Sequence, residues 1–550
     1  MRSKATTLVV SSLGFGLAVL SAACGAIVGI RDVGDQPVNG EAGIDSSMQV
    51  DASPDAQGDA STDAPVTGFD TGEAHFLQAG DQVGIEYVTM AGATKSLTIA
   101  ANGPFTLPER ARAATVKSAP AGKRCWQRTA NGKLDVRCVL MATTKIAPYT
   151  TDSATFVAVP GAEQTFTTDL PSSTMLVALS IPWLTTSGPE VIHPAYSTAY
   201  VRAIIDNDTT KSIDLTRAST YWHQPGMHLL VGTVEVGPGA HTLSVELRHT
   251  VPSPVAGRTA IFGGTVDDGG TPFDFKPELI HVALESMETF DRLHKAPLGS
   301  EVLLPPADAN QWKPAGSLSV PIPAPRKAVV AAYYPEVSVQ SPGAGVAGTF
   351  ALMAGPDVLA SYELAHLQDE GGVRGVTMVR GLSANAPLSV RVDHRTVLGP
   401  NRISLKNGAA ISAMLFSDAS SVQSWTFAGD TDFDTPVDEW QTVVGSKQAV
   451  KTRGKAIVFL SLNRTATTIA GGSHELALFD GDTEIARGFG QSWSFEYSQG
   501  QPLATVVDFG TPGTHEISLR IRKKVGIPKL RHGTVPDGRG LSAITVLPIE

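Results

Sequence analysis

A short acidic stretch near the C-terminal third of the chain is the part of the sequence best suited to bind a metal ion. Its carboxylates stand at alternate positions, and oxygen ligands at this spacing suit Ca²⁺. Two positions differ from a twelve-residue Ca²⁺ loop, because Thr435 replaces its glycine and Gln441 its last glutamate. The stretch therefore predicts either a Ca²⁺ site or a solvated acidic loop, with the candidate ligands Asp430, Asp432, Asp434 and Asp438.

Three aromatic residues alternate along one expected strand: Trp493, Phe495 and Tyr497. Alternate residues of a strand point to the same face of a sheet, so the three rings share one face. An exposed aromatic face can stack on the rings of a sugar, whereas a buried one fills the core of a sandwich. Both interpretations stay open, and the three residues are the candidate ligand-binding residues.

Motifs of common enzymes are missing from the sequence. The patterns G-x-S-x-G, H-E-x-x-H and the phosphate-binding loop do not occur. His241 and His515 each follow a Pro-Gly pair by the same spacing, which indicates a turn that starts a strand and favours a structural role. No catalytic residue is predicted. Whether the chain is an enzyme stays open, and a non-enzymatic role is favoured.

The three cysteines divide into a pair and a single residue. Asn131-Gly132 predicts a two-residue hairpin turn, and counting outward from it places Cys125 opposite Cys138. The pair falls at a non-hydrogen-bonded position, where Cα atoms lie roughly 4.5 Å apart, within the range of a disulfide. We therefore expect a Cys125–Cys138 disulfide; two buried free thiols are the alternative. Cys24 is left over.

The first 23 residues have the features of an export signal. Arg2 and Lys4 precede an apolar run, Leu8 to Leu20, that at about 13 residues is too short to span a bilayer as a helix. The following Ser-Ala-Ala-Cys resembles the lipobox of bacterial lipoproteins, which implies lipid on Cys24 and a membrane as partner. Ser21 stands where that motif usually has leucine, so cleavage that releases a soluble protein is the alternative.

The resemblance also implies a location. Gly25 follows the cysteine, in place of the aspartate that retains many lipoproteins of Gram-negative bacteria in the inner membrane. We therefore expect an exported protein that is anchored by lipid in the outer membrane or at the cell surface.

Charge is distributed unevenly along the chain. Residues 32–66 contain eight acidic and no basic residues, and aspartates recur every fourth residue from Asp51 to Asp63. These like charges would repel each other on a helix, and prolines interrupt it, so 24–71 is predicted to be a disordered, lipid-anchored linker. Residues 67–550 contain 40 basic and 45 acidic residues, a balance that argues against nucleic-acid binding.

Short apolar segments and frequent turn residues predict an all-β fold of several β-sandwiches. The sequence contains 54 Gly and 36 Pro, and helix-period segments are scarce. Residues 72–142 form the first predicted module. Its Ala101-Asn102-Gly103-Pro104-Phe105-Thr106-Leu107-Pro108 stretch, with the cysteine-bearing segment that follows, resembles immunoglobulin-like modules of bacterial surface lipoproteins. The resemblance implies a fold and a location.

Three diverged copies of one unit are predicted after this module, at 154–286, 300–418 and 436–550. Each copy contains an early apolar strand, a hairpin, an alternating strand and a closing apolar strand. About eight candidate strands per copy suit a jelly roll, and the third copy is similar to the jelly-roll modules of extracellular and phage-derived proteins. The early apolar strands are 175–181, 328–334 and 456–462.

These early strands are apolar on both faces, which predicts cover on both faces. One face would fill the sandwich core and the other would pack against a neighbouring copy, so that three copies close as a pseudo-threefold cluster. Separate sandwiches strung along the chain are the alternative.

The sequence therefore predicts a lipid-anchored β-sandwich protein of the cell envelope with a binding, adhesion or structural role. Its ligand would be a glycan or a protein at the cell surface, and no cofactor beyond Ca²⁺ is expected. The alternative function is an envelope hydrolase or carbohydrate-active enzyme whose active site is built from loops.

Overall fold

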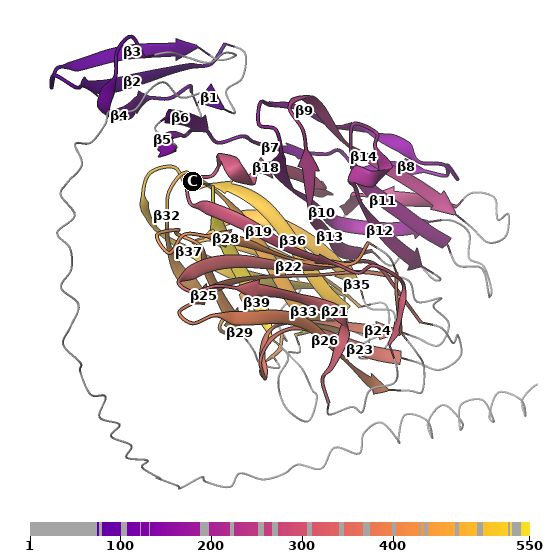
Figure 1. The fold of residues 1–550 in the computed structure, drawn as a ribbon. Helices are drawn as coiled ribbons and strands as arrows, with labels where there is room; N and C mark the ends of the chain where they lie inside the picture. Colours follow the sequence, from indigo (N-terminus) through magenta and orange to yellow (C-terminus); the bar gives the residue numbers. More distant parts are fainter. Residues whose placement is uncertain are drawn as a thin grey trace, which may run out of the picture. The chain divides into compact units, whose positions relative to one another are not determined.

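The protein is almost entirely β-structured, as the sequence predicts (Figure 1). Within the described residues of this computed structural model, the helical segments are two 3₁₀ turns, and no helix is long and apolar enough to cross a membrane. The residues described are 74–75, 80–100, 107–121, 123–130, 133–187, 197–219, 225–250, 258–266, 273–304, 311–339, 346–366, 374–398, 403–406, 408–427, 431–433, 438–467, 472–491, 499–525, 528–530 and 541–549.

The N-terminal module contains two three-stranded sheets that share one apolar core. One sheet has the order β3 (Thr94–Ala100), β2 (Gln82–Thr89), β4 (Ala111–Ser118), and the other has β1 (Ala74–His75), β6 (Lys133–Cys138), β5 (Cys125–Ala130). Alternate residues of β2 point into the core, including Val83, Ile85 and Tyr87. The alternation follows from the period of two in a strand.

The predicted disulfide between Cys125 and Cys138 is confirmed. The two residues are directly opposite each other in the β5–β6 hairpin, and their Cα atoms are 3.9 Å apart. Ala130 is opposite Lys133, which is the register that the Asn131-Gly132 turn predicts.

Each of the three sandwiches that follow contains two main four-stranded layers. In the first sandwich, one layer has the order β7 (Met141–Lys145), β18 (Glu278–Ala283), β10 (Ser173–Ser187), β13 (Gly226–Val236), and the other has β9 (Val157–Thr168), β14 (Gly239–Thr250), β11 (Ser197–Ile205), β12 (Ser212–Ser219). Short strands β8 (Tyr149–Thr151) and β15 (Thr259–Phe262) extend the first layer, and β16 (Gly264–Val266) pairs with β17 (Phe273–Phe275).

The second sandwich repeats this order. Its layers are β19 (Phe290–Pro297), β28 (Ala410–Phe416), β22 (Arg326–Val339), β25 (Arg374–Ala384), and β21 (Lys313–Ile322), β26 (Leu388–Leu398), β23 (Val346–Ala354), β24 (Asp357–His366). The short strands β20 (Val302–Leu304) and β27 (Ile403–Leu405) pair with each other beside β22.

The third sandwich repeats it again. Its layers are β29 (Gln423–Phe427), β39 (Ser542–Pro548), β33 (Lys455–Thr467), β36 (Gln499–Asp508), and β32 (Gln448–Thr452), β37 (Gly513–Val525), β34 (Ser473–Asp480), β35 (Thr483–Gln491). The short strands β30 (Thr431–Asp432), β31 (Gln441–Thr442) and β38 (Pro528–Leu530) lie at its edges.

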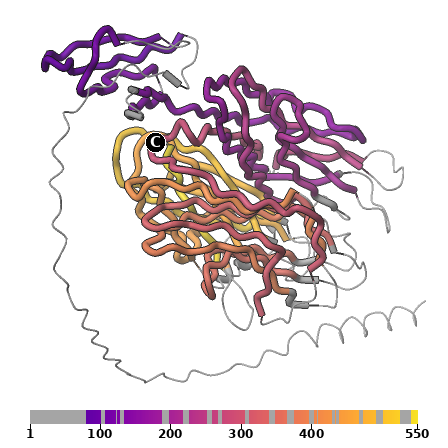
Figure 2. Tube along the Cα trace, in the orientation of Figure 1, coloured from indigo at the N-terminus to yellow at the C-terminus, as the bar shows by residue number. Residues whose placement is uncertain are grey.

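This strand order, in which the first, eighth, third and sixth strands form one layer, is that of a jelly roll. Figure 2 follows the chain through the three units in order. The first strand of each unit is β7, β19 or β29. The sequence analysis placed β19 and β29 between modules, and β7 starts at the end of its first module and runs into the segment that follows. Strand β7 is short and threonine-rich, and its residues are half-buried or exposed, so its sequence lacks an alternating apolar pattern.

Neighbouring sandwiches are joined through their edge strands. One pair, Arg217 with Arg374, links β12 of the first sandwich to β25 of the second, and Leu364 with Gln499 links β24 of the second to β36 of the third. Two ten-stranded sheets result. Each edge that would otherwise expose unpaired backbone groups is partly covered in this way.

The prediction that the early apolar strands are covered on both faces is confirmed. In β22, Val330, Ala332 and Tyr334 belong to the core of the second sandwich. The alternate residues Val329, Ala331 and Tyr333 belong to an apolar cluster that includes buried residues of all three sandwiches. The sandwiches therefore pack against one another, and the separate-sandwich alternative is wrong.

Serine hydroxyls repeat at two of the three interfaces. Ser461 Oγ of β33 accepts a hydrogen bond from Val379 N of β25 at 2.8 Å, and Ser180 Oγ of β10 accepts one from Ala504 N of β36 at 3.0 Å. Strand β35 of the third sandwich contacts the first, since a Cβ added to Gly488 would lie 2.5 Å from Met227 Cε of β13. The contacts thus form a closed cycle.

Two histidines are buried without charge in these sandwiches. His281 and His474 have exposed fractions of 0% and 1%, and burial lowers the pKa of each to about 4. His281 Nδ1 lies 2.6 Å from Gln164 Oε1, whereas neither ring nitrogen of His474 has a hydrogen-bonding partner among the residues that the structure describes.

We predict that acid destabilises the protein through these histidines. The unfolded pKa is about 6.5, so the unfolded chain binds more protons below that pH. Their stabilising effect is complete above pH 6.5 and is lost as the pH falls toward 4, by up to about 3 kcal/mol for each histidine. His474→Leu should flatten this acid limb in denaturant unfolding measured from pH 7.5 to 4.5. Equal slopes of unfolding free energy against pH for variant and wild type would contradict the prediction. The difference in unfolding free energy at pH 7.5 measures the effect of the substitution on packing.

Candidate functional site

A large cavity lies where the N-terminal module meets the first two sandwiches. Its volume is about 1100 Å³, and strands β5, β6, β10, β13 and β19 contribute to its lining, together with the 3₁₀ turns η1 (Thr209–Lys211) and η2 (Leu284–Ser286). We call it the cleft. A volume of this order is sufficient for a drug-sized ligand or a short segment of polymer.

The β5–β6 hairpin is fixed to one wall of the cleft by hydrogen bonds. Trp126 Nε1 donates to Ser286 O at 2.8 Å, and Arg137 Nη1 donates to Glu285 O at 2.8 Å. Ser286 Oγ accepts from Leu140 N at 3.0 Å. The disulfide closes the same hairpin, so the wall that carries Trp126 is held rigidly.

Both signs of charge line the cleft. Glu285 Oε2 accepts from Thr174 N at 2.8 Å, and Asp291 lies 2.9 Å from Arg326 and 3.3 Å from Arg292. Burial acts to raise the pKa of Asp291, but the hydrogen bonds from these two arginines outweigh it, and the net pKa is lowered. Asp291 is therefore an ionised acceptor. The charged lining residues are Arg137, Lys211, Arg292, Lys295, Glu235, Glu285, Glu288 and Asp291.

Lys295 of β19 also lines the cleft. Its Nζ donates to Thr233 O of β13 at 2.9 Å. Burial lowers the pKa of this amine, and the charge of Glu235 partly opposes the shift. Among the described residues, the buried hydroxyl of Thr233 has no hydrogen-bonding partner. The amine of Lys295 is thus the group available to a polar ligand at this point.

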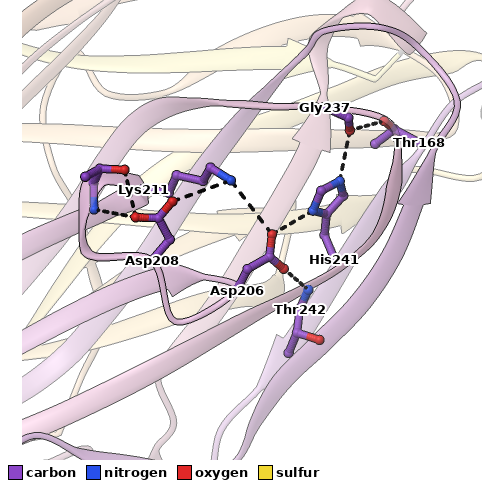
Figure 3. A network of polar contacts seen from close by, with 8 residues as sticks. Thr168, Asp206, Asp208, Lys211, Gly237, His241 and Thr242 are labelled. Carbon is purple, nitrogen blue, oxygen red and sulfur yellow. Dashed lines mark hydrogen bonds and ion pairs between the residues drawn. The ribbon is translucent and has the colours of Figure 1, made fainter.

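A polar network holds the η1 turn in the cleft wall (Figure 3). Asp206 Oδ2 lies 2.8 Å from His241 Nδ1, Asp206 Oδ1 accepts from Thr242 N at 2.9 Å, and His241 Nε2 lies 2.9 Å from Gly237 O. Lys211 Nζ is 3.6 Å from Asp208 and 4.0 Å from Asp206. Burial acts to raise the pKa of Asp206, but the hydrogen bonds from His241 and Thr242 outweigh it and the net pKa is lowered.

The third sandwich contains the same arrangement, in agreement with the structural role predicted for the two histidines. His515 Nδ1 lies 2.8 Å from Asp480 Oδ2, and Glu516 N donates to Asp480 Oδ1 at 3.2 Å. In the second sandwich, Arg391 Nη2 donates to Gly355 O of the matching turn at 3.1 Å. The network therefore fixes a hairpin to the strand beside it.

The geometry suits binding by ion pairs, hydrogen bonds and one aromatic edge. The described lining of the cleft contains hydroxyl, carboxylate, amine and guanidinium groups. Nucleophilic catalysis needs a hydroxyl or thiol that is activated by an adjacent base. Among the described lining hydroxyls, Thr210 Oγ1 donates to Asp208 Oδ1 at 2.7 Å within the η1 turn, and Ser212 Oγ donates to Thr209 O at 3.1 Å.

The predicted Ca²⁺ ligands fall largely outside the described residues. This holds for Asp430, Asp434 and the side chain of Asp432. Asp438 is described, and its Oδ1 lies 2.6 Å from Lys524 Nζ. Across the described residues, no group of three or more potential ligands converges on a point. The aromatic candidates Trp493, Phe495 and Tyr497 also lie outside them, as does Cys24.

Sequence reasoning missed the residues that line the cleft. Trp126 is next to Cys125, and the disulfide was the one available signal that its hairpin is fixed. Lys295 and Asp291 belong to β19, a strand that was not predicted. Because the cleft forms between modules, its lining residues come from several segments and no single sequence motif predicts it.

Comparison with known proteins gives no family for this chain. No protein-family model matches it, and no curated protein matches. The insecticidal delta-endotoxin Cry8Ea1 of Bacillus thuringiensis is similar over 50% of this chain and 52% of its own, with 10% identity and a TM-score of 0.15. Dimeric latent PorU of Porphyromonas gingivalis is similar over 70% of this chain and 34% of its own, with 9% identity and a TM-score of 0.16. Likenesses this weak indicate no function.

We predict that Asp206→Ala loosens the wall of the cleft. The change removes the acceptor of Thr242 N and of the partly buried His241, and the net loss of such hydrogen bonds costs about 0.5–1.5 kcal/mol. Denaturant unfolding should show this loss, and hydrogen exchange should be faster at the Thr242 amide. Asp480→Ala is the matched control: a similar loss of stability is expected, with exchange faster at Glu516 and unchanged at the cleft. A variant of Asp206 as stable as wild type would show that the network has no role in holding the turn.

Proposed function

We propose that this chain is a lipid-anchored β-sandwich protein of the bacterial cell envelope that binds a ligand in the cleft, in a binding, adhesion or structural role. The observation that carries the proposal is the cleft itself. Three modules build it together, and hydrogen bonds and ion pairs to neighbouring residues hold its charged groups in place. A preformed polar cavity of this kind offers a ligand oriented partners without a rearrangement of the protein.

The leader and the linker support the envelope location. The Ser-Ala-Ala-Cys sequence at residues 21–24 resembles a lipobox, and the acidic segment that follows suits a spacer between a membrane and a folded ectodomain. A disulfide in the first module suits an oxidising compartment outside the cytoplasm. The ligand proposed for such a protein is a glycan or a protein at the cell surface.

The anchor is tested by removing its thiol. In a Gram-negative host, the full chain should fractionate with the outer membrane and partition into detergent, and mass spectrometry should find an acylated Cys24 at the mature N-terminus. Cys24→Ser should move the protein to the soluble fraction, because membrane attachment depends on the acyl chains. A Cys24→Ser protein that stays in the membrane, or an unmodified Cys24 in the wild type, would contradict lipid anchoring.

The cleft is tested with envelope polymers as probes. The purified ectodomain should be retained in a saturable way by at least one of peptidoglycan, lipopolysaccharide or outer-membrane vesicles. Glu235→Gln with Arg292→Gln should weaken retention about tenfold, since each loses a charged contact. The control is Lys447→Gln with Glu516→Gln, an exposed pair in the third sandwich whose charged atoms are 2.7 Å apart.

Three outcomes of this experiment decide against the proposal. Wild-type protein that none of the polymers retains would remove a binding role at the envelope. Equal retention of the cleft variant and the control would place binding elsewhere. Release of soluble fragments from a polymer by the wild type, lost in the cleft variant, would favour the envelope hydrolase instead.

A further inference from the structure

A smaller crevice lies between the first and second sandwiches and adjoins the cleft. Its volume is about 420 Å³, and Ser212, Thr233 and Lys295 line both cavities. One wall is five consecutive residues of β12, from Ser212 to Thr216, and the opposite wall includes Pro335, Glu336 and Gly408. The β12 edge is paired with β25 at Arg217 alone among the described residues, so the segment before Arg217 faces the crevice.

The interface between the second and third sandwiches provides an internal comparison. The strand pairings place Glu336 and Arg464 at the same position, the second residue of a bulge in β22 and in β33. They also make Thr216 and Glu363 equivalent, because each precedes the single residue that joins two sandwiches. By the same count, Asp214 corresponds to Ser361.

In the second–third interface, a guanidinium fills the space between these positions. Arg464 Nη1 lies 2.5 Å from Glu363 Oε1, with exposed side-chain fractions of 7% and 9%. Beside this pair, Ser361 Oγ donates to Asn463 Oδ1 at 2.9 Å, and Ser361 N donates to Leu541 O at 2.9 Å. The ion pair and its neighbours close this interface.

In the first–second interface, the guanidinium is replaced by a carboxylate. Glu336 stands in place of Arg464, and its one recorded side-chain contact is a long hydrogen bond of 3.4 Å from Thr216 Oγ1. Pro335 replaces Asn463, so the amide that accepts from Ser361 in the other interface has no counterpart here, and Gly408 replaces the larger Leu541. The crevice is the space that results, and Asp214 is exposed at its mouth.

A buried hydroxyl without a partner also lines the crevice. Tyr333 is 5% exposed, and its OH forms no hydrogen bond within the described part of the chain. Its equivalents at the other two interfaces are Ser180 and Ser461, whose hydroxyls both bond the facing strand. Burial, followed by the charge of Asp214, raises the pKa of Tyr333 well above its usual range, so the phenol stays neutral and can accept a hydrogen bond.

The two lysines that line the crevice already have acceptors. Lys295 donates to Thr233 O, and Lys406 Nζ lies 3.0 Å from Glu301. The guanidinium carbon of Arg248 stacks 4.0 Å from the ring centroid of Tyr200. These contacts leave the carboxylate of Glu336 for a donor that comes from outside the chain. The phenol oxygen of Tyr333 is buried behind the crevice surface, and a small shift of the side chain is needed to bring it to such a donor.

We propose that this crevice binds a guanidinium group supplied by a ligand, in the position that the Arg464 guanidinium occupies in the second–third interface. Glu336 and Asp214 would accept its N–H groups, and Tyr333 OH would accept another, since a guanidinium has five donors in a fixed plane. The ligand is a small guanidinium compound or an arginine side chain of a partner protein. The inference rests on the proposed binding role and names one chemical group that the protein recognises.

The first test is a calorimetric titration of the purified ectodomain with N-acetyl-arginine amide. Saturable binding is expected, at least tenfold tighter than for the citrulline counterpart, which has the same shape without the charge. An arginine-containing hexapeptide distinguishes the sources. Tighter binding than the amide indicates an arginine presented by a polypeptide, and equal binding indicates a small compound.

Variants locate the site. Glu336→Gln should weaken binding at least tenfold, and Tyr333→Phe about threefold or more, because each loses an acceptor of the guanidinium. Thr216→Glu combined with Glu336→Arg copies the other interface into this one, so it should abolish binding while thermal unfolding shows a protein at least as stable. Glu516→Gln, on the third sandwich, is the matched control and should bind like the wild type. If Glu336→Gln does not fold, Asp214→Asn is measured in its place and should also weaken binding.

Several outcomes would overturn the proposal. They are no saturable binding of either arginine probe, equal binding of the citrulline compound, or binding of methyl glycosides that Glu336→Gln removes. Retention on envelope polymers is measured in parallel. If arginine binding fails while retention persists, the guanidinium site is wrong and the proposed function stands. If retention fails while arginine binding persists, the proposed envelope binding is wrong and the guanidinium site stands.

Discussion

Burial of one strand on both of its faces is the constraint on which this structure depends. Strands β10, β22 and β33 alternate between residues that fill their own sandwich and residues that face another. A sandwich on its own would leave the second set exposed to water, with the cost of exposed apolar area. Three sandwiches in contact remove that cost together, which explains why one apolar cluster contains buried residues of all three.

The three sandwiches share one fold, but their interfaces differ because a few positions carry different residues. The second residue of the bulge is Trp183, Glu336 or Arg464 in the three sandwiches. Trp183 packs among aromatic rings, with centroids 4.7 Å from Phe489 and 5.6 Å from Phe275, and Arg464 forms an ion pair. A bulge side chain is not part of either core, so it can change without disturbing the strand order.

Patterns with a short period carried the predictions that succeeded. The Asn131-Gly132 turn fixed the register of its hairpin, so the position of Cys125 opposite Cys138 followed from counting. The double-sided apolar strands predicted that the sandwiches pack together. The edge strands β7 and β19 were not predicted, because their residues are largely exposed or half-buried and apolar residues do not alternate with polar ones along them.

The cavities could not be predicted in this way. The cleft collects Trp126, Glu235 and Asp291 from strands far apart in sequence, and each looks ordinary in its own segment. Glu336 is recognised as unusual only by comparison with Arg464, which occupies the same position in the third sandwich. That comparison requires the strand register at both bulges. The acidic and aromatic candidates at 430–438 and 493–497 stay predictions, because most of them lie outside the described residues.

The cycle of contacts also sets an order for synthesis. Strand β13 is made in the first half of the chain, whereas its neighbour β35 is made near the end. A nascent chain therefore carries an uncovered sheet edge on its first sandwich until almost all of it has been translated. An uncovered strand edge is a template for wrong pairing, so the first sandwich depends on the last one for full protection of this edge.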